Sequence, residues 1–357
     1  MKAARWHAAR DIRVEDIPEP VVKDGQVKVK VKWCGICGSD LHEYCIGPIS
    51  IPVAAPHPLS GETAPVVMGH EFSGEVVEVG AGVTNVKPGD RVVVEPILAC
   101  GECPSCKEGK YNTCEKLGFH GLAGGGGGFS EYTTFASRFV HKIPDSLSYE
   151  KAALVEPIAV GYHSLMVGNF RGGDVAVVAG AGPIGLATIE CLRALGASKI
   201  ICVQLRSIRH QYALEAGADV VFDPNETDVL AEVYKLTGGR GADIAFDTTG
   251  AEPCYHLLFD CVRRHGTLVI TSIWEKSVTI NLNKSVMTEK NVVGSLCYCD
   301  EFPKVIDLIA KGRIKADNYA TSKIYIDDVV SKGFDVLIGP DKLKEVKILV
   351  TPDKSLL

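Results

Sequence analysis

A glycine-rich turn, Gly180-Ala181-Gly182-Pro183-Ile184-Gly185, most constrains the fold of this 357-residue chain. The turn follows a short apolar run at 174–179 and opens a helical pattern that reaches Leu195. In a G-x-G-x-x-G turn the glycines permit a tight bend, a close approach of the backbone to a pyrophosphate, and close packing of the helix on the strand. The turn therefore predicts a dinucleotide site at Gly180, Gly182, Pro183, Ile184 and Gly185. The alternative is a glycine-rich turn that binds no ligand.

The stretch after this turn keeps alternating between strand-like and helical sequence. A second helical pattern ends near Gly217, and apolar strand-like runs recur at 199–203, 219–222, 242–247 and 267–272. Strand followed by helix in this rhythm is typical of a doubly wound parallel sheet with helices on both faces. We therefore predict an α/β chain in which residues 158–295 form a dinucleotide-binding domain.

The first half of the chain has a different pattern. Apolar and polar residues alternate from 26 to 32, which is the period of a half-buried strand, and further β-type runs lie at 73–79 and 91–95. The mostly apolar run 346–350 near the end of the chain is expected to pair with these strands. We therefore predict a second domain, mostly antiparallel β, formed by residues 1–157 and 296–357.

The residue after the second strand of a dinucleotide fold helps to select the cofactor. An acidic residue there holds the ribose 2'-hydroxyl of NAD, but this chain has Gln204 at that place. Arg206 and Arg209 follow shortly, and a guanidinium is suited to bind a phosphate. We therefore expect these three residues to contact the cofactor and NADP(H) to be favoured over NAD(H). In the alternative reading the arginines are solvated residues of the next helix, and Gln204 still binds the ribose.

A compact group of cysteines follows the first strands, with the spacing C-x2-C-x2-C-x7-C. Four thiolates at such short spacing can close a tetrahedron around one zinc ion. Because four thiolates leave no open coordination position, the site predicted from them is structural. An iron–sulfur cluster and a pair of disulfides are the alternatives. The four residues are Cys100, Cys103, Cys106 and Cys114.

Charge and cysteine content restrict the classes of partner. The formal net charge of −6 argues against a nucleic-acid partner, because such a partner requires a basic face. Residues 1–12 carry charges with no apolar segment behind them, and the longest apolar stretch, 175–187, is interrupted by glycine and proline. We therefore expect a cytoplasmic protein that has no membrane partner, and whose thirteen cysteines are metal ligands and buried thiols.

A second set of candidate metal ligands lies in two separate short segments. One runs from Cys34 and Cys37 to Ser39, Asp40 and His42, and the other is Gly69-His70-Glu71. Taken singly, the two cysteines can be a redox pair, and a lone histidine is more often a satisfied core residue than a ligand. Their combination in one chain is far more specific than either segment alone.

The combination resembles the zinc-dependent medium-chain dehydrogenase/reductase family. The stretch Gly69-His70-Glu71-x2-Gly74-x5-Gly80-x2-Val83 fits a motif of that family, and the similarity extends over essentially the whole chain. Within the family, the segments 33–44 and 154–157 look most like the (R,R)-2,3-butanediol dehydrogenase branch, as does the long segment between Cys45 and Met68. The resemblance implies a GroES-like catalytic domain joined to a Rossmann coenzyme domain.

The resemblance also implies roles for individual residues. A catalytic zinc would be held by Cys37, His70 and Glu156, with one position left for water or substrate. If the family resemblance is set aside, Glu156 can instead be a carboxylate at the start of a helix, beside Pro157, where the helix dipole stabilises its negative charge. Asp40 and Glu71 would orient the ligands and tune the metal, although Glu71 is also a candidate to enter the ligand shell. The proton released on alcohol oxidation would pass through Ser39 and His42.

These roles imply an oxidoreductase that transfers hydride between NAD(P)(H) and a small vicinal diol or acyloin, such as 2,3-butanediol, acetoin or diacetyl. A polyol dehydrogenase of the sorbitol type, or another secondary-alcohol dehydrogenase, is the nearest alternative. A dinucleotide-binding protein without catalysis is a more distant one, and a zinc module for nucleic acid is weaker still. The family resemblance further implies a homodimer or homotetramer.

Overall fold

The chain divides into two compact units in the computed structural model, which describes residues 1–317 and 319–357. The first unit comprises Met1–Glu156, Phe302–Ala310 and Tyr319–Leu357. The second comprises Pro157–Glu301 and a short segment that begins at Lys311. The sequence-based boundaries, 157/158 and 295/296, lie one and six residues from the two main transitions of this division, and the return of Lys311 to the second unit was not anticipated.

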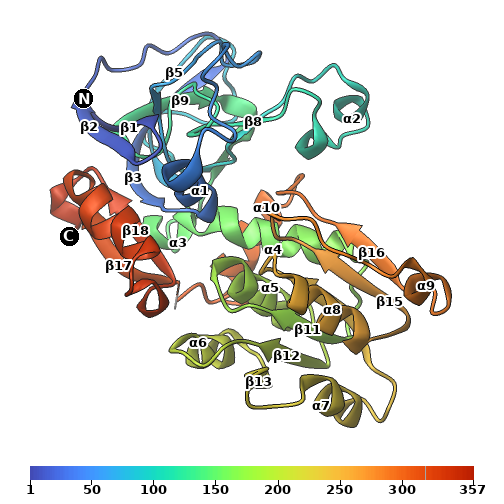
Figure 1. Ribbon diagram of the computed structural model, residues 1–357. Coiled ribbons are helices and arrows are strands. Elements are labelled where there is room, and N and C mark those ends of the chain that lie inside the picture. The colour runs from blue at the N-terminus through green and yellow to red at the C-terminus, as the bar shows by residue number, and fades with distance from the viewer. Residues whose placement is uncertain (318) are drawn as a thin grey trace. The chain divides into compact units, whose positions relative to one another are not determined.

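A mixed sheet built around the long strand β3 (Gln26–Gly35) forms the body of the first unit (Figure 1). Strand β3 pairs antiparallel with β5, β9 and β18, and β18 pairs parallel with β17. The expected return of the C-terminal run to the first strands is thus confirmed. The strands of this sheet are β10 (Val140–Lys142), β6 (Arg91–Val94), β5 (Glu71–Val79), β3, β18 (Lys347–Thr351), β17 (Ala320–Tyr325) and β9 (Tyr132–Ala136).

Smaller sheets and short helices complete this unit. Strands β2, β1 and β4 form one small sheet, and β7 pairs with β8 in another. Figure 1 shows the lobe around α2 standing apart from the strands of the main sheet. The elements are β1 (Lys2–Ala8), β2 (Asp11–Asp16), β4 (Val66–Val67), β7 (Ile97–Leu98), β8 (Gly118–Phe119), α1 (Gly38–Ile46), α2 (Pro104–Lys107), α3 (Tyr149–Ala153), α10 (Phe302–Ala310) and α11 (Asp335–Ile338).

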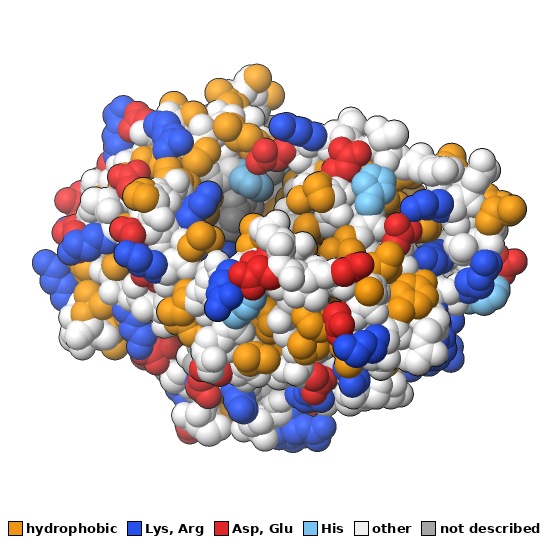
Figure 2. Space-filling model, turned by 60° about the horizontal axis from the view of Figure 1, so that its bottom comes forward, with side chains coloured by type: hydrophobic (Ala, Val, Ile, Leu, Met, Phe, Trp, Pro, Cys, Tyr) orange, Lys and Arg blue, Asp and Glu red, His pale blue; other side chains and the backbone are white. Residues whose placement is uncertain are grey.

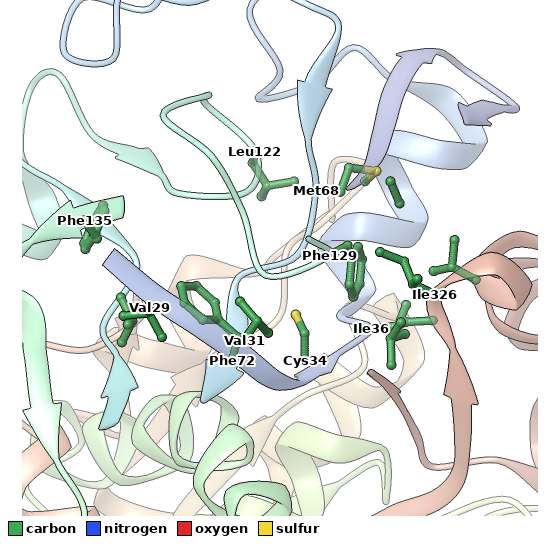
Figure 3. Packing of buried hydrophobic residues seen from close by; sticks show 14 of the residues in the cluster. Val29, Val31, Cys34, Ile36, Met68, Phe72, Leu122, Phe129, Phe135 and Ile326 are labelled. Atoms are coloured by element: carbon green, nitrogen blue, oxygen red, sulfur yellow. The ribbon is translucent and has the colours of Figure 1, made fainter. Parts of the chain in front are cut away.

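The core of the first unit explains the alternation seen in the sequence. Val27, Val29 and Val31 of β3 are fully buried, and Figure 3 shows Val29 and Val31 packed close to Phe72. The intervening lysines lie on the other face of the sheet, since successive strand residues point to opposite faces. This packing fixes the register of β3 and hence the place of the cysteine segment that follows it.

The second unit contains the parallel sheet that the sequence predicts. Its strand order is β13-β12-β11-β14-β15-β16, and every neighbouring pair is parallel. The strands are β11 (Val175–Ala179), β12 (Lys199–Val203), β13 (Val220–Phe222), β14 (Ala242–Asp247), β15 (Val262–Ile270) and β16 (Asn291–Gly294). The helices are α4 (Val155–Val167), α5 (Pro183–Ala194), α6 (Arg209–Ala216), α7 (Val229–Leu236), α8 (Glu252–Cys261) and α9 (Leu282–Val286).

The strand order of this sheet reverses direction between β11 and β14. Chain order runs outward from β11 through β12 to β13, and then from β14 through β15 to β16. In open parallel sheets a ligand binds beyond the carboxyl ends of the strands where the order reverses in this way. The glycine turn follows β11 directly, so the fold places it at that position.

The distribution of surface charge and the length of the helices both concern the kinds of partner that the protein could bind. Figure 2 shows acidic and basic side chains interspersed over the face that it presents. Among the helices of residues 1–317 and 319–357, none combines the length and the apolar character that a bilayer crossing requires.

Candidate metal centres and dinucleotide site

The four predicted cysteines come together in the lobe around α2. The sulfur atoms of Cys100, Cys103, Cys106 and Cys114 all lie within 4.8 Å of one another. Cys100 Sγ is 3.5 Å from Cys114 Sγ and 3.9 Å from Cys106 Sγ. All thirteen cysteines fall in the described part of the chain and are free thiols, so the disulfide alternative is wrong for this structure.

The backbone of this lobe prepares the sulfur atoms to bind a cation. The amides of Glu102 and Cys103 donate to Cys100 Sγ at 3.5 and 3.4 Å, and the amide of Lys116 donates to Cys114 Sγ at 3.3 Å. The first two hydrogen bonds lower the pKa of Cys100 to about 6, whereas burial raises the pKa of Cys106 to about 12. The convergence of four sulfur atoms, and not a common pKa shift, makes this donor set fit a metal held by four sulfur ligands.

A second group of possible ligands brings together residues from separate segments. Cys37 immediately precedes α1, His70 precedes β5, and Glu71 is the first residue of that strand. One ligand atom from each lies within 4.8 Å of the others. Cysteine sulfur, imidazole nitrogen and carboxylate oxygen are the ligands that zinc takes in proteins, so this donor set fits zinc.

Gly69 allows the chain to place His70 there. Its φ is +89°, and a Cβ at this residue would stand 2.8 Å from both Cys34 Sγ and the Phe129 ring. Only glycine tolerates both constraints. Cys34 itself is fully buried in the core, where Figure 3 shows it close to Val31, and burial raises the pKa of its thiol well above the ordinary value. Cys34 is therefore poorly suited to a redox pair with Cys37.

One ring nitrogen of His70 lacks a hydrogen-bond partner among the described residues. Its Nε2 is paired with Ser39 Oγ at 3.2 Å, whereas its Nδ1 lies 3.4 Å from Oδ1 of the buried Asp40 without a hydrogen bond between them. Burial lowers the pKa of His70, but the charges of Asp40 and Cys37 outweigh burial and raise it above the usual value. The other Asp40 oxygen accepts the Cys37 amide at 2.9 Å, so Asp40 links two of the candidate ligands.

The two residues predicted to relay a proton both lie on α1. Ser39 is in contact with His70, as described above, and His42 is half-buried one turn further along the helix. Their spacing of three places both side chains on the same side of the helix. Their role in proton transfer stays a prediction.

The acidic member of the ligand group is Glu71, whereas the sequence favoured Glu156. Glu156 is the second residue of α4 and is buried. Its charge contributes to raising the pKa of Lys347, the lysine that binds Glu71. Its role as a ligand stays a prediction.

Lys347 is a site residue that the sequence interpretation missed. It lies on β18 and is almost completely buried, with Nζ at 2.5 and 2.6 Å from the two oxygens of Glu71. Burial lowers the pKa of Lys347, but the charges of Glu71 and Cys37, and less strongly Glu156, raise it above the ordinary value. The signal was available, because Lys347 is a charged residue inside the apolar run 346–350.

The glycine turn has the local structure that the sequence predicts. It connects β11 to α5, with Gly180 at a φ of +93°, Gly182 as the N-cap and Pro183 as the first helical residue. A Cβ on Gly185 would overlap the carbonyl oxygen of Gly180, which accounts for the third glycine. The start of α5 thus follows a turn whose glycines carry no side chains, which suits the approach of a pyrophosphate to the helix N-terminus.

The predicted cofactor-selecting residues occupy different environments. Gln204 follows β12, and its Oε1 accepts the Ala181 amide of the turn at 2.6 Å. Arg206 is exposed and forms two 3.1 Å hydrogen bonds to Glu226. Arg209 is half-buried, and its Nη1 lies 3.9 Å from where a Cβ on Gly182 would be. Of the two arginines, Arg209 is the one close to the glycine turn.

Comparisons with known proteins agree with this arrangement. Residues 23–145 match the family model of the alcohol dehydrogenase GroES-like domain, and residues 183–311 match that of zinc-binding dehydrogenases. The chain is 52% identical to (R,R)-butanediol dehydrogenase of Bacillus subtilis (strain 168), over 99% of this chain and all of that protein.

Solved structures of dehydrogenases are similar to this chain as well. The crystal structure of 2R,3R-butanediol dehydrogenase from Bacillus subtilis superposes with a TM-score of 0.92 at 52% identity, over 99% of each chain. A zinc-binding dehydrogenase from Sinorhizobium meliloti 1021, described as putative and bound to NADP, superposes with a TM-score of 0.89 at 30% identity, over 98% of this chain and 99% of that one.

Proposed function

Because the chain belongs to the zinc-dependent medium-chain alcohol dehydrogenase family, we propose that it interconverts a small vicinal diol or acyloin with its ketone. The substrates would be of the 2,3-butanediol, acetoin and diacetyl type, with hydride exchanged with a nicotinamide dinucleotide. The observation that carries this proposal is the 52% identity to a butanediol dehydrogenase along the whole chain.

The candidate site supports the reaction through the chain's own residues. Zinc held by Cys37, His70 and Glu156 would act as a Lewis acid on the oxygen of the substrate. Asp40 lies against the His70 ring, and Ser39 and His42 would relay the proton released on alcohol oxidation. Glu71 stands beside the ligands with its carboxylate held by Lys347.

The four-cysteine lobe would hold a second, structural zinc. Four sulfur ligands leave no coordination position for substrate, so this metal would stabilise the lobe around α2. The chain would then bind two zinc ions of different function.

NADP(H) is proposed as the favoured cofactor over NAD(H). Gln204 brings no negative charge to the end of β12, and Arg209 lies close to Gly182 of the phosphate-binding turn. The Sinorhizobium relative bound to NADP shows that a protein of this fold accepts that cofactor.

We further propose that the protein forms a homodimer or homotetramer and is located in the cytoplasm. Strand β16 is at the edge of the parallel sheet, and an unpaired edge strand is a ready site for association. Several exposed apolar side chains lie near it in the sequence, and such patches are typical of subunit interfaces. They are Leu282, Val286, Met287 and Val292. Thirteen free thiols suit a reducing compartment.

The direct test is kcat/KM for the reduction of acetoin and diacetyl with NADPH and NADH in parallel, on protein of known zinc content. Turnover with a preference for NADPH supports both the reaction and the cofactor assignment. Turnover with a preference for NADH would keep the reaction and contradict the cofactor assignment. No turnover with either cofactor would favour polyols as substrates, to be assayed next, and failure there would favour a binding protein without catalysis.

A further inference from the structure

The Glu71 carboxylate has two possible partners within reach. One of its oxygens lies within 4.8 Å of the ligand atoms of Cys37 and His70, so the side chain is placed to join a metal there. Both oxygens are instead bound by Lys347 Nζ, at 2.5 and 2.6 Å. A carboxylate bound through both oxygens by an ammonium group has little freedom to turn towards another cation.

The lysine is itself held firmly. Lys347 Nζ makes a further 3.2 Å hydrogen bond to the carbonyl oxygen of Ile36, the residue before Cys37. The three donors of the ammonium group are thereby used on two oxygens of Glu71 and one backbone oxygen. The side chains of Lys347 and Glu71 are 2% and 0% exposed, so no solvent competes for these contacts.

The backbone of β3 leaves room for this pair. A Cβ on Gly35 would overlap Glu71 Oε2 and stand 3.2 Å from Cδ of Lys347. The absence of a side chain at residue 35 therefore lets the ion pair pack against the strand that leads into Cys37. The pair is built into the fold directly beside the candidate ligands.

We propose that Lys347 is a positioning residue that keeps Glu71 out of the ligand shell of the catalytic metal. The inference rests on the proposed function, because it requires a metal at Cys37 and His70. A buried carboxylate that loses its cation must take up a proton or bind another cation, and the metal site lies within reach of Glu71. Removal of Lys347 is therefore expected to transfer Glu71 to the metal and to change the coordination of the metal. If the ion pair served only to fasten β18 to β5, removal would lower stability without this change.

Cobalt replacement of zinc provides the test, because the visible d–d absorption of Co²⁺ responds to the number and type of its ligands. The spectrum is recorded for the wild-type protein and for the variants Lys347→Met, Lys347→Arg and Lys347→Met/Glu71→Gln. Subtraction of the Cys37→Ser spectrum removes the contribution of the four-cysteine lobe. The kcat/KM for acetoin reduction is measured on the same zinc-loaded proteins.

The expected result has three parts. Lys347→Met changes the d–d spectrum and lowers kcat/KM by about ten- to a hundred-fold, the loss typical of an outer-shell change at a metal site. Lys347→Arg keeps the pair and the wild-type spectrum. The double variant lacks the competing carboxylate, so its spectrum returns to that of the wild type. Lys347→Gln, which retains polarity and volume, replaces Lys347→Met if that variant does not fold.

Two results would overturn the inference while leaving the proposed function intact. One is an unchanged cobalt spectrum in Lys347→Met, or in Lys347→Gln where it is used. The other is a double variant whose spectrum stays like that of the single one. A wild-type protein without any thiolate-to-cobalt charge-transfer band dependent on Cys37 would instead contradict the proposed metal site, and the inference with it.

Discussion

Gln204 Oε1 accepts a hydrogen bond from the backbone amide of Ala181 at 2.6 Å, which ties the end of β12 to the glycine turn. An acidic residue at this place holds the ribose of NAD in many dinucleotide folds. Here a neutral amide fills the position and brings no charge that would repel a 2'-phosphate. We therefore expect selection of the cofactor to depend on the arginines that follow.

Arg209 is predicted to contribute more to NADPH binding than Arg206. Arg209 lies next to Gly182, whereas Arg206 is already bound to Glu226. A hydrogen bond to a charged group contributes about 1.5–3 kcal/mol, so Arg209→Ala should weaken NADPH binding about ten-fold or more. Fluorescence titration with NADPH and NADH measures this effect, with Arg206→Ala as the matched control. An equal loss for both cofactors would show that Arg209 does not recognise the 2'-phosphate.

Substitutions at two glycines of the turn should separate cofactor binding from folding. Gly182 has a φ of −77°, and a Cβ added there would stand 3.9 Å from Arg209 Nη1, an ordinary van der Waals distance, so Gly182→Ala should fold with an unchanged Tm. The added methyl group nevertheless lies where the pyrophosphate approaches the backbone, so NADPH binding should weaken at least about ten-fold. Gly185→Ala should lower the Tm as well, because its Cβ overlaps the Gly180 carbonyl. Normal cofactor affinity in Gly182→Ala would contradict the assignment of this turn.

Neighbouring cysteines provide a matched test of the catalytic centre. Cys37 belongs to the ligand group, whereas Cys34 is a core residue three positions earlier. Cys37→Ser should lose about one zinc per chain and nearly all activity, while Cys34→Ala should retain both metals and lose only stability. Metal analysis by mass spectrometry, together with the rate of acetoin reduction, measures both effects. Full zinc content in Cys37→Ser would disprove the ligand assignment.

His120 should make the protein sensitive to acid. It is fully buried, with Nε2 at 2.6 Å from Thr133 Oγ1, and burial lowers its pKa to about 3. The unfolded chain takes up this proton near pH 6.5 and the folded chain does not, so stability is lost as the pH falls from about 6.5 towards 3. One proton contributes a slope of at most about 1.4 kcal/mol per pH unit.

The variant His120→Gln should remove this part of the pH dependence. The free energy of unfolding in urea, measured at pH 7 and pH 5, should fall less in His120→Gln than in the wild type. His256→Gln, at an exposed histidine, is the control and should follow the wild type. Equal acid sensitivity in the wild type and His120→Gln would show that His120 is protonated in the folded protein.

Features that depend on nearby residues could be predicted from the sequence. The glycine turn between β11 and α5 and the four-cysteine lobe were both located correctly, because their residues lie within 15 positions of each other. The parallel sheet and the antiparallel domain also followed from local periodicity. For the same reason, helix α6 ends where Gly217 predicted.

Contacts between distant segments could not be predicted in this way. Lys347 and Glu71 are 276 positions apart, and only the pairing of β18 with β3 brings the lysine to the metal ligands. No local pattern indicated that Arg206 would be bound by Glu226, twenty positions later. A sequence pattern indicates which residues belong to the same helix or strand. The partner of a buried charged residue depends instead on how the helices and strands pack against one another.

The most direct test of the central claim is the rate of NADPH-dependent acetoin reduction as a function of zinc content. The protein would be depleted of zinc by a chelator and reloaded in steps, with wild type and Cys37→Ser compared at each step. Activity in the wild type should rise with zinc and reach a plateau when both sites are filled, while Cys37→Ser should stay inactive. Full activity in zinc-free protein, or equal activity in Cys37→Ser, would contradict the central claim.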